Sequence, residues 1–261
     1  MKILTRLLFI TRGVRYALDG VIFARKSYSS DMEELKNKYL NSPMLIVGNG
    51  PSLNITPLDD FIGIRSIGMN KIDLLFDKVR WRPDLIVCTN NLVVQQHHEE
   101  MVKHGIPCLL SWKSRWFMPR WRRKEFTFFL NKNENKFSME PNKGVGVSGT
   151  VTYTALQFAH YMGANPVILF GVDHSFQYEG APNDIQKRTG SDSNHFDPNY
   201  FASGQYWGVP NLALSEYGYQ QAKEAFEQGG RKVYDATVGG KLDIFEKISV
   251  EQALKLCDLG D

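Results

Sequence analysis

The chain has 261 residues, of which 43% are hydrophobic and 23% charged, and its formal net charge is +3. These values exclude a disordered or fibrous chain and fit one globular domain with a small appendage. So small a net charge does not by itself indicate a nucleic-acid partner. The three cysteines, Cys88, Cys108 and Cys257, lack CxxC spacing. This argues against a disulfide framework and a zinc site and favours a reducing, cytoplasmic location.

Residues 1–42 are predicted to form a basic, amphipathic helical segment ahead of the main domain. Basic residues interrupt its apolar positions, which recur at helical spacing: Lys2, Arg6, Arg12 and Arg15. The apolar runs are too short to span a bilayer, and no small-residue cleavage site is present. Two interpretations stay open: a helix lying on an anionic membrane surface, and a helix packed on the domain with its charges in solvent.

Residues 43–261 are predicted to form a single α/β domain. A helix is expected over 31–41, ending at Asn-Ser-Pro, and a second over 150–162. Strands are expected at 44–47, 66–69, 85–88, 108–111, 167–170 and 232–235. Short apolar strands separated by enough chain for a helix are typical of a Rossmann-like parallel sheet with helices on both faces, which binds ligands at the carboxyl ends of its strands.

The first predicted strand of this domain ends in a turn, Gly48-Asn49-Gly50-Pro51-Ser52. Its glycines permit close approach of another molecule, and Ser52 offers a hydroxyl and a helix N-cap. Backbone N–H groups at such a turn favour phosphate. Only part of the G-x-G-x-x-G pattern is present, because Leu53 stands where the third glycine is required, so the turn is a weak indication of NAD.

Two further loops are expected to contribute to a site. The glycine-rich stretch 144–149, with Ser148 or Thr150 as N-cap of the following helix, is either a second anion-binding turn or a tight structural connection. Residues 176–211 are polar and irregular, which predicts a lid or binding loop over the site.

Five short motifs occur along the chain in a recognisable order: Gly48-Asn49-Gly50-Pro51-Ser52, Gly68-Met69-Asn70, Thr89-Asn90-Asn91, Val147-Ser148-Gly149 and Gly171-Val172-Asp173. Through them, residues 43–245 resemble the bacterial sialyltransferase-like superfamily. It includes the CMP-sialic acid-dependent sialyltransferases, the motility-associated-factor flagellin glycosyltransferases and the 6-hydroxymethylpterin diphosphokinase-like domain family.

The resemblance implies metal-independent glycosyl transfer from a CMP-sugar, with a lid over the donor. It assigns donor or nucleotide binding to Gly48, Asn49, Gly50, Pro51, Ser52, Asn70, Asn90, Ser148, Gly149 and Gly171. The chain departs from the sialyltransferases where their aromatic pair is replaced by His174 and Ser175, and where an arginine before Thr-Ser-Gly has no counterpart, Lys143 being the nearest cation. Gly-Val-Asp-His-Ser looks closer to the flagellin and pterin enzymes.

The general base is expected to be a histidine, because its pKa lies near neutral pH. His195 in the predicted lid and His174 at a strand end are the two candidates. A third possibility, that neither histidine is the base, stays open. Asp173 could orient His174, contact a ribose, bind Mg²⁺ or cap a turn. Tyr200 and Tyr206 are candidates for contacting the leaving phosphate, or they pin the loop to the core. His97 and His98, before two glutamates, predict a solvated helix surface.

Residues 112–124 interleave tryptophan with arginine and lysine. Such a block can stack on single-stranded nucleic acid, lie at a lipid headgroup layer, or form a solvated face over packed tryptophans. Taken together with basic residues 1–26, it favours peripheral contact with an anionic membrane, and we expect no nucleic-acid partner.

Three functions are consistent with the sequence. The first is a glycosyltransferase that moves a nonulosonic (sialic-type) acid from a CMP donor to a cell-surface glycan or lipid-linked acceptor, with no cofactor and no metal. The second is a pterin-type diphosphokinase, which requires ATP and Mg²⁺. The third is a non-catalytic nucleotide-binding module. We expect a cytoplasmic protein at the inner face of the cytoplasmic membrane, and an oligomer is compatible with the sequence.

Overall fold

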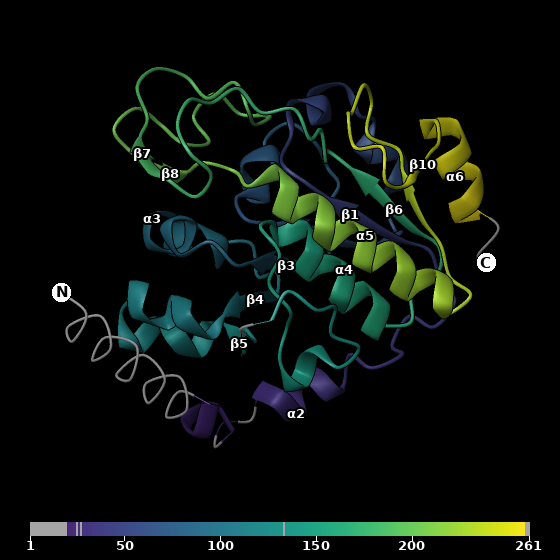
Figure 1. Cartoon of the computed structure of the whole chain (residues 1–261), viewed down its shortest axis with the longest axis horizontal. Coiled ribbons are helices and arrows are strands. Elements are labelled where there is room, and N and C mark those ends of the chain that lie inside the picture. The colour runs from purple at the N-terminus through teal and green to yellow at the C-terminus, as the bar shows by residue number, and fades with distance from the viewer. Residues whose placement is uncertain (1–19, 25, 27, 133, 259–261) are drawn as a thin grey trace.

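A computed structural model describes residues 20–24, 26, 28–132 and 134–258, so residues 1–19 of the helical segment predicted over 1–42 lie outside the described residues. An eight-stranded sheet forms the centre of the fold (Figure 1), with the strand order β10-β9-β6-β1-β2-β3-β4-β5 and every pairing parallel. Its strands are β1 (Met44–Val47), β2 (Arg65–Met69), β3 (Leu85–Cys88), β4 (Cys108–Ser111), β5 (Thr127–Phe129), β6 (Val167–Phe170), β9 (Val233–Asp235) and β10 (Glu246–Lys247). The predicted Rossmann-like α/β fold is confirmed.

Helices flank this sheet, and α4 with α5 lies across one face of it in Figure 1. The α-helices are α2 (Tyr28–Glu33), α3 (Asn91–Met101), α4 (Val151–Tyr161), α5 (Leu212–Gln228) and α6 (Val250–Asp258), and residues 20–24 are also helical. The 3-10 helices are η1 (Pro51–Ile55), η2 (Leu58–Phe61), η3 (Ile72–Leu75), η4 (Trp112–Phe117), η5 (Arg120–Glu125) and η6 (Pro141–Lys143). Among the described residues, no helix combines the length and apolar character needed to cross a membrane.

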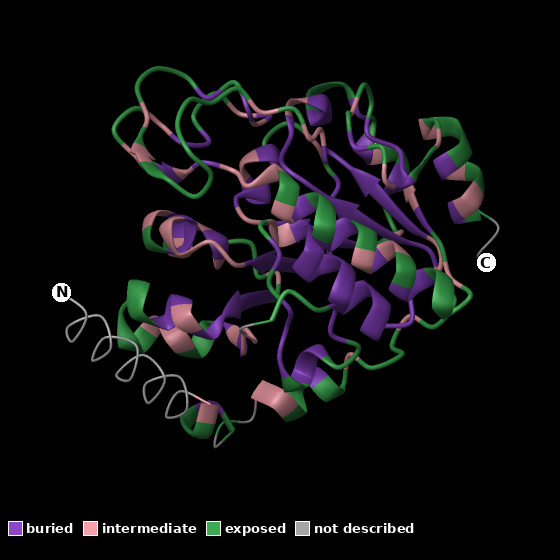
Figure 2. Ribbon diagram, in the orientation of Figure 1, coloured by how far each residue is buried: buried purple, intermediate pink, exposed green. Residues whose placement is uncertain are grey.

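The central strands are apolar on both sides because both faces of the sheet are covered. Every residue of β1, β3, β4 and β6 is buried, and Figure 2 shows this continuous buried layer. Continuous apolar runs are the expected pattern of a covered parallel sheet, which is why these strands were predictable. The edge strands β5 and β10, of three and two residues, were not predicted.

The helix predicted over 31–41 is wrong in its extent. It begins at Tyr28 and ends at Glu33, and turns follow. Asn37 and Asn41 adopt positive φ angles of 54° and 57°. Their backbone N–H groups donate to the carbonyls of Tyr161 and Gly163 at the end of α4. These tertiary hydrogen bonds replace the helical ones, so apolar spacing alone overstated the helix.

The helix predicted over 150–162 is confirmed as α4, with Thr150 as its N-cap. The predicted lid, residues 176–211, holds a two-stranded antiparallel hairpin of β7 (Ile185–Lys187) and β8 (Tyr206–Gly208). Between these two strands lie buried residues such as Phe196 and Tyr200. The lid therefore has a hairpin that is largely exposed apart from Trp207, and a buried inner part.

Candidate functional site

The parallel sheet reverses its strand order at β1, which lies between β2 and β6. Crevices outside the carboxyl ends of strands at such a point are the usual ligand sites of this architecture. Here a cavity of about 530 Å³ opens at that edge, within the range of small-molecule sites. Residues from five strand ends line it: Gly48, Asn49 and Gly50, Met69 and Asn70, Thr89 and Asn90, Ser111, and Gly171 to Phe176.

Three helices begin at the wall of this cavity. Asn90, Thr150 and Asn211 are the N-caps of α3, α4 and α5, and each side chain accepts a hydrogen bond from a backbone N–H of its own helix. All three N-caps line the cavity. The partial positive charge at a helix N-terminus favours anions, so three converging N-termini make the cavity suited to a negatively charged ligand. Sequence analysis identified one of these, the start of α4.

The turn Gly48–Ser52 closes one side of the cavity, but its N–H groups serve the protein rather than a ligand. The N–H groups of Gly48 and Gly50 donate to the carbonyls of Phe170 and Gly171, at 2.7 and 2.9 Å. The Ser52 N–H donates to a carboxylate oxygen of Asp173 at 3.0 Å. The predicted backbone phosphate cradle is therefore corrected at these positions, and Asn49 is left as the polar side chain that the turn presents.

Asp173 fixes this turn and does not orient His174. Its second oxygen accepts a hydrogen bond from the Ser52 hydroxyl at 2.7 Å, so Ser52 is a partner of Asp173 rather than the predicted N-cap. Burial raises the pKa of Asp173, and the bonds from Ser52 act against that. Glycine is required here, because a Cβ on Gly50 would lie 1.7 Å from Asp173 Oδ2 and one on Gly48 would lie 2.2 Å from the Gly171 carbonyl.

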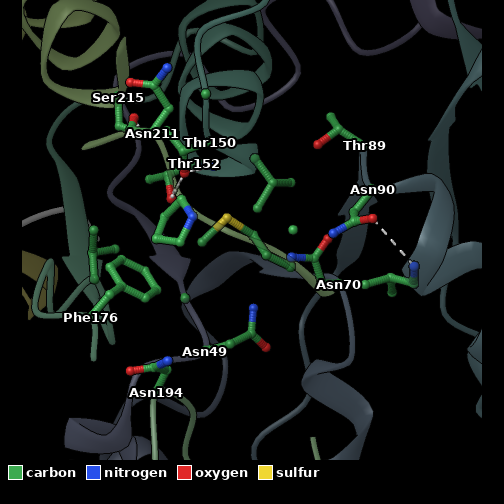
Figure 3. Close-up of a pocket in the computed structure, with 18 of the residues that line it drawn as sticks. Asn49, Asn70, Thr89, Asn90, Thr150, Thr152, Phe176, Asn194, Asn211 and Ser215 are labelled. Carbon is green, nitrogen blue, oxygen red and sulfur yellow. Dashed lines mark hydrogen bonds between the residues drawn. The ribbon is translucent and has the colours of Figure 1, made fainter. Parts of the chain in front are cut away.

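Many amide and hydroxyl side chains line the cavity, together with apolar ones. Eight asparagines occur among the described residues that line it: Asn49, Asn70, Asn90, Asn91, Asn131, Asn183, Asn194 and Asn211. Figure 3 shows Asn49, Asn70, Asn90 and Asn194 around one space. The Oδ1 atoms of Asn49 and Asn70 are buried and have no hydrogen-bond partner within the described part of the chain. Buried polar atoms of this kind normally have a partner, which a ligand would supply here.

His195 lines the cavity within a hydrogen-bonded pair. Its Nδ1 lies 2.8 Å from Asp192 Oδ2, and its ring stacks on Tyr200 with centroids 3.9 Å apart and planes at 2°. Burial acts to raise the pKa of Asp192, but the hydrogen bond and charge of His195 outweigh it and the pKa is lowered. With Nδ1 held by Asp192, Nε2 is the atom of His195 suited to take a proton from a ligand.

His174, the second candidate base, is turned toward α5. It adopts a positive φ of 53°, and its Nε2 lies 2.9 Å from Glu216 Oε1. The residue lines the cavity, with its Nε2 already paired to Glu216. The structure therefore brings both histidines to the cavity and pairs one ring nitrogen of each with a carboxylate: His195 with the buried Asp192, and His174 with the exposed Glu216.

The two candidate tyrosines are placed differently. Tyr200 is buried and lines the cavity, and its hydroxyl accepts from the Lys71 N–H at 3.3 Å. Burial raises its pKa well above the usual range. Tyr206 is 49% exposed on β8 and is not among the lining residues. Pro51 and Ser52 also lie behind the lining, while Ser148, Gly149 and Gly171 form part of it.

Two buried ionisable residues beside the site were missed or misplaced by sequence analysis. Lys71 Nζ donates to the Tyr200 carbonyl at 2.6 Å and to Gln205 Oε1 at 3.2 Å, and burial lowers its pKa to about 8. His97, predicted to be solvated, is buried and contacts both oxygens of Asp73, at 2.9 and 2.7 Å. Lys71 comes directly after Asn70, beyond the end of β2. That position is the sequence feature from which its place near the site could have been predicted.

The comparisons with known proteins agree with this architecture. The family model described as 6-hydroxymethylpterin diphosphokinase MptE-like matches residues 80–179, which run from before β3 to the start of the lid. Over 89% of this chain the fold is similar to the MAf glycosyltransferase from Magnetospirillum magneticum AMB-1, with a TM-score of 0.50 and 16% sequence identity. The chain is similar to the MptE-like and MAf glycosyltransferase proteins. The predicted resemblance to this superfamily is confirmed.

Each comparison covers part of a protein. The chain spans 42% of the length of the MAf glycosyltransferase, and at 16% identity the likeness establishes the fold alone. No curated protein matches the chain significantly. The MptE-like match includes Asn90, Ser148 and Asp173 but not the Gly48–Ser52 turn or His195.

Proposed function

We propose that this protein is a glycosyltransferase that moves a sugar from a nucleotide-activated donor to an acceptor hydroxyl. The observation that carries the proposal is the convergence of three helix N-termini on a cavity rich in asparagine. Helix N-termini favour phosphate, and amides both donate to and accept from sugar hydroxyls and base edges. The similar fold of a protein titled a glycosyltransferase gives further support.

We propose a CMP-activated sialic-type sugar as the donor. Such a donor carries two separate anions, the phosphate of CMP and the carboxylate of the sugar, together with many hydroxyl groups. A cavity with three separate helix starts can favour two anions at once. Among the described residues that line it, Lys113 is the single lysine or arginine, so backbone dipoles would provide most of the positive potential.

His195 would act as the general base. Its Nε2 would take the proton of the acceptor hydroxyl as the acceptor oxygen bonds to the anomeric carbon and the bond from that carbon to the CMP phosphate breaks. Asp192, 2.8 Å from Nδ1, would stabilise the imidazolium that forms. The helix N-termini would stabilise charge on the departing phosphate. We propose that the transfer needs no metal ion for this reason.

The family match favours a second candidate, a diphosphokinase that uses ATP and Mg²⁺ on a pterin alcohol. That reaction requires carboxylates to hold the metal. Asp173 uses both of its oxygens on Ser52, and Asp235 pairs with Lys247 at 2.7 Å. Asp173 is the single acidic residue among the described residues that line the cavity. These contacts favour the glycosyltransferase.

A thermal-shift panel tests the choice, since a ligand that binds the folded state raises its apparent stability. CMP, CDP, UDP, GDP and ATP are each measured with and without Mg²⁺. We expect CMP to raise the melting temperature independently of Mg²⁺. In a second, coupled assay, we expect the protein to release CMP from CMP-sialic acid in the presence of an acceptor. Stabilisation by ATP with Mg²⁺ but not by CMP would support the diphosphokinase instead. Binding without turnover, unchanged by His195→Asn, would indicate a non-catalytic module.

A further inference from the structure

A second surface lies beside the cavity, on the two 3-10 helices η4 and η5. We define the aromatic–basic surface as residues 113–125. Three large apolar side chains are exposed there: Trp116 at 53%, Trp121 at 61% and Phe117 at 37%. Large exposed apolar groups gathered in one segment mark an interaction surface.

Arginines layer over the exposed tryptophans. The guanidinium of Arg123 lies 5.4 Å from the centroid of the Trp116 ring, and that of Arg122 lies 4.5 Å from the centroid of Trp121. These cation–π contacts hold the rings in place while leaving them accessible. A tryptophan with an apolar body, a polar N–H and a cation beside it is suited to the headgroup layer of a bilayer.

The charge of this surface is strongly positive. Five basic residues that are at least partly exposed stand against one acidic residue, Glu125, which pairs with Arg122 at 3.1 Å; the five are Lys113, Arg120, Arg122, Arg123 and Lys124. Burial, together with the neighbouring charge of Arg120, lowers the pKa of Arg123. Crowded positive charge of this kind is complementary to an anionic partner and repels a second copy of the same surface.

The apolar part continues into residues 20–24. Phe23 packs edge-to-face on Trp112, the buried first residue of η4, with ring centroids 5.5 Å apart. On the same short helix Val21 and Ile22 are 52% and 46% exposed. Exposed aliphatic side chains such as these have no partner in a nucleic-acid groove, but they insert readily among lipid chains.

We propose that the aromatic–basic surface, with residues 20–24, binds the surface of an anionic lipid bilayer. Tryptophan and aliphatic side chains would enter the headgroup boundary while the arginines and lysines contact lipid phosphates. Two weak elements together give stable peripheral binding where either alone is marginal.

The cavity is adjacent to this surface. Lys113, on the same 3-10 helix as Trp116, is one of the residues that line it. A bilayer bound at η4 would therefore lie near the cavity, which favours an acceptor carried in the membrane. This last point rests on the proposed glycosyltransferase function, whereas bilayer binding itself does not.

Vesicle co-sedimentation of the full chain tests the proposal. One set of vesicles is phosphatidylcholine alone, and the other also contains phosphatidylglycerol. We expect binding to the anionic vesicles that weakens with salt, and about tenfold weaker binding for W116A/W121A and for R120Q/K124Q. The matched control Y217A/K255Q alters an exposed tyrosine on α5 and an exposed lysine on α6, and should bind like the wild type. Thermal melting checks that every variant is folded.

The outcomes separate the possible occupants. Equal binding of W116A/W121A and wild type, or no sedimentation with anionic vesicles, would overturn the proposal. Binding of a single-stranded oligonucleotide that is lost in the same variants, without vesicle binding, would assign the surface to nucleic acid. A dimer in size-exclusion chromatography that W116A/W121A dissociates, again without vesicle binding, would assign it to a second copy. The thermal shift with CMP is measured separately, so a negative result with vesicles does not bear on the proposed donor site.

Discussion

The carboxylate of Asp173 accepts two hydrogen bonds from Ser52, one from the backbone N–H at 3.0 Å and one from the hydroxyl at 2.7 Å. The two residues are 121 positions apart and join the ends of β1 and β6. They hold the Gly48–Ser52 turn against the neighbouring strand end, which sets the position of Asn49 at the cavity.

Gly50→Ala should break this clamp, because its Cβ would lie 1.7 Å from Asp173 Oδ2. We expect a loss of about 1–3 kcal/mol of stability from the unpaired carboxylate and at least tenfold weaker CMP binding, measured by urea unfolding and calorimetry. Gly20→Ala, where nothing lies within 4 Å, is the control. Wild-type CMP affinity in Gly50→Ala would contradict this role of the clamp.

Replacing Asn49 with leucine should separate binding from stability. Its Oδ1 is buried and unpaired within the described part of the chain, so an apolar side chain of similar size removes a polar group that has no partner. We expect CMP binding to weaken about tenfold or more while the melting temperature stays equal or rises. Asn199→Leu, at an exposed lid position, should leave CMP binding unchanged. A fall in melting temperature with unaltered affinity would assign Asn49 a structural role.

The proposed base can be tested with paired variants. His195→Asn should lower kcat for CMP-sialic acid about 10²- to 10⁴-fold and leave CMP affinity within a few-fold. Asp192→Asn should lower kcat as well, because it removes the carboxylate that stabilises the charged ring. His174→Gln removes the pairing with Glu216 and the edge-on contact with the Tyr219 ring, and we expect it to affect turnover much less. The reverse ranking of His195 and His174 would move the base assignment to His174.

The sequence predicted the sheet and the strand-end residues well because both follow from local patterns. Buried parallel strands are continuous apolar runs, and the residue after such a strand, as at Asn70 or Asn90, must face the carboxyl edge of the sheet. Pairings between distant residues have no local pattern. Nothing near Asp173 indicates that it contacts Ser52, and nothing near His97 indicates the buried Asp73 beside it. The position of a residue at the carboxyl edge of the sheet was therefore easier to predict than the contacts that its side chain makes there.

The loop ahead of α4 depends on one buried side chain, Gln157. Its amide oxygen accepts from the N–H groups of Ser138 and Gly146, and its amide nitrogen donates to the carbonyls of Gly146 and Tyr153. Gln157→Leu would leave these groups unpaired in the interior, and we expect about 2–4 kcal/mol lower stability by urea unfolding. Gln220→Leu, on the exposed side of α5, should change stability by less than about 0.5 kcal/mol.

Stability should also fall in mild acid because of His160. Burial, with the charge of Arg231 next to it, lowers the pKa of His160 to about 4, against about 6.5 when unfolded. The unfolded chain therefore binds the proton first, and the contribution of neutral His160 is present above pH 6.5 and is lost as pH falls toward 4, by about 3 kcal/mol in all. Melting curves from pH 7 to 4.5 should fall less steeply for His160→Gln than for wild type. Equal slopes would show that another group controls the acid loss.

The inner part of the lid is hydrogen-bonded to the end of β1 and the residues that follow it. The Phe196 N–H donates to the Asn49 carbonyl at 3.0 Å, the Asn54 amide donates back to the Phe196 carbonyl at 2.9 Å, and Lys71 holds the Tyr200 carbonyl. This inner part is rigidly built into the domain, so a ligand meets a wall formed in advance and little ordering entropy opposes binding. We therefore expect the substrate and product of the proposed reaction to enter and leave past the β7–β8 hairpin. Substitutions in that hairpin should change rates of entry and release, whereas those in the inner part should change affinity.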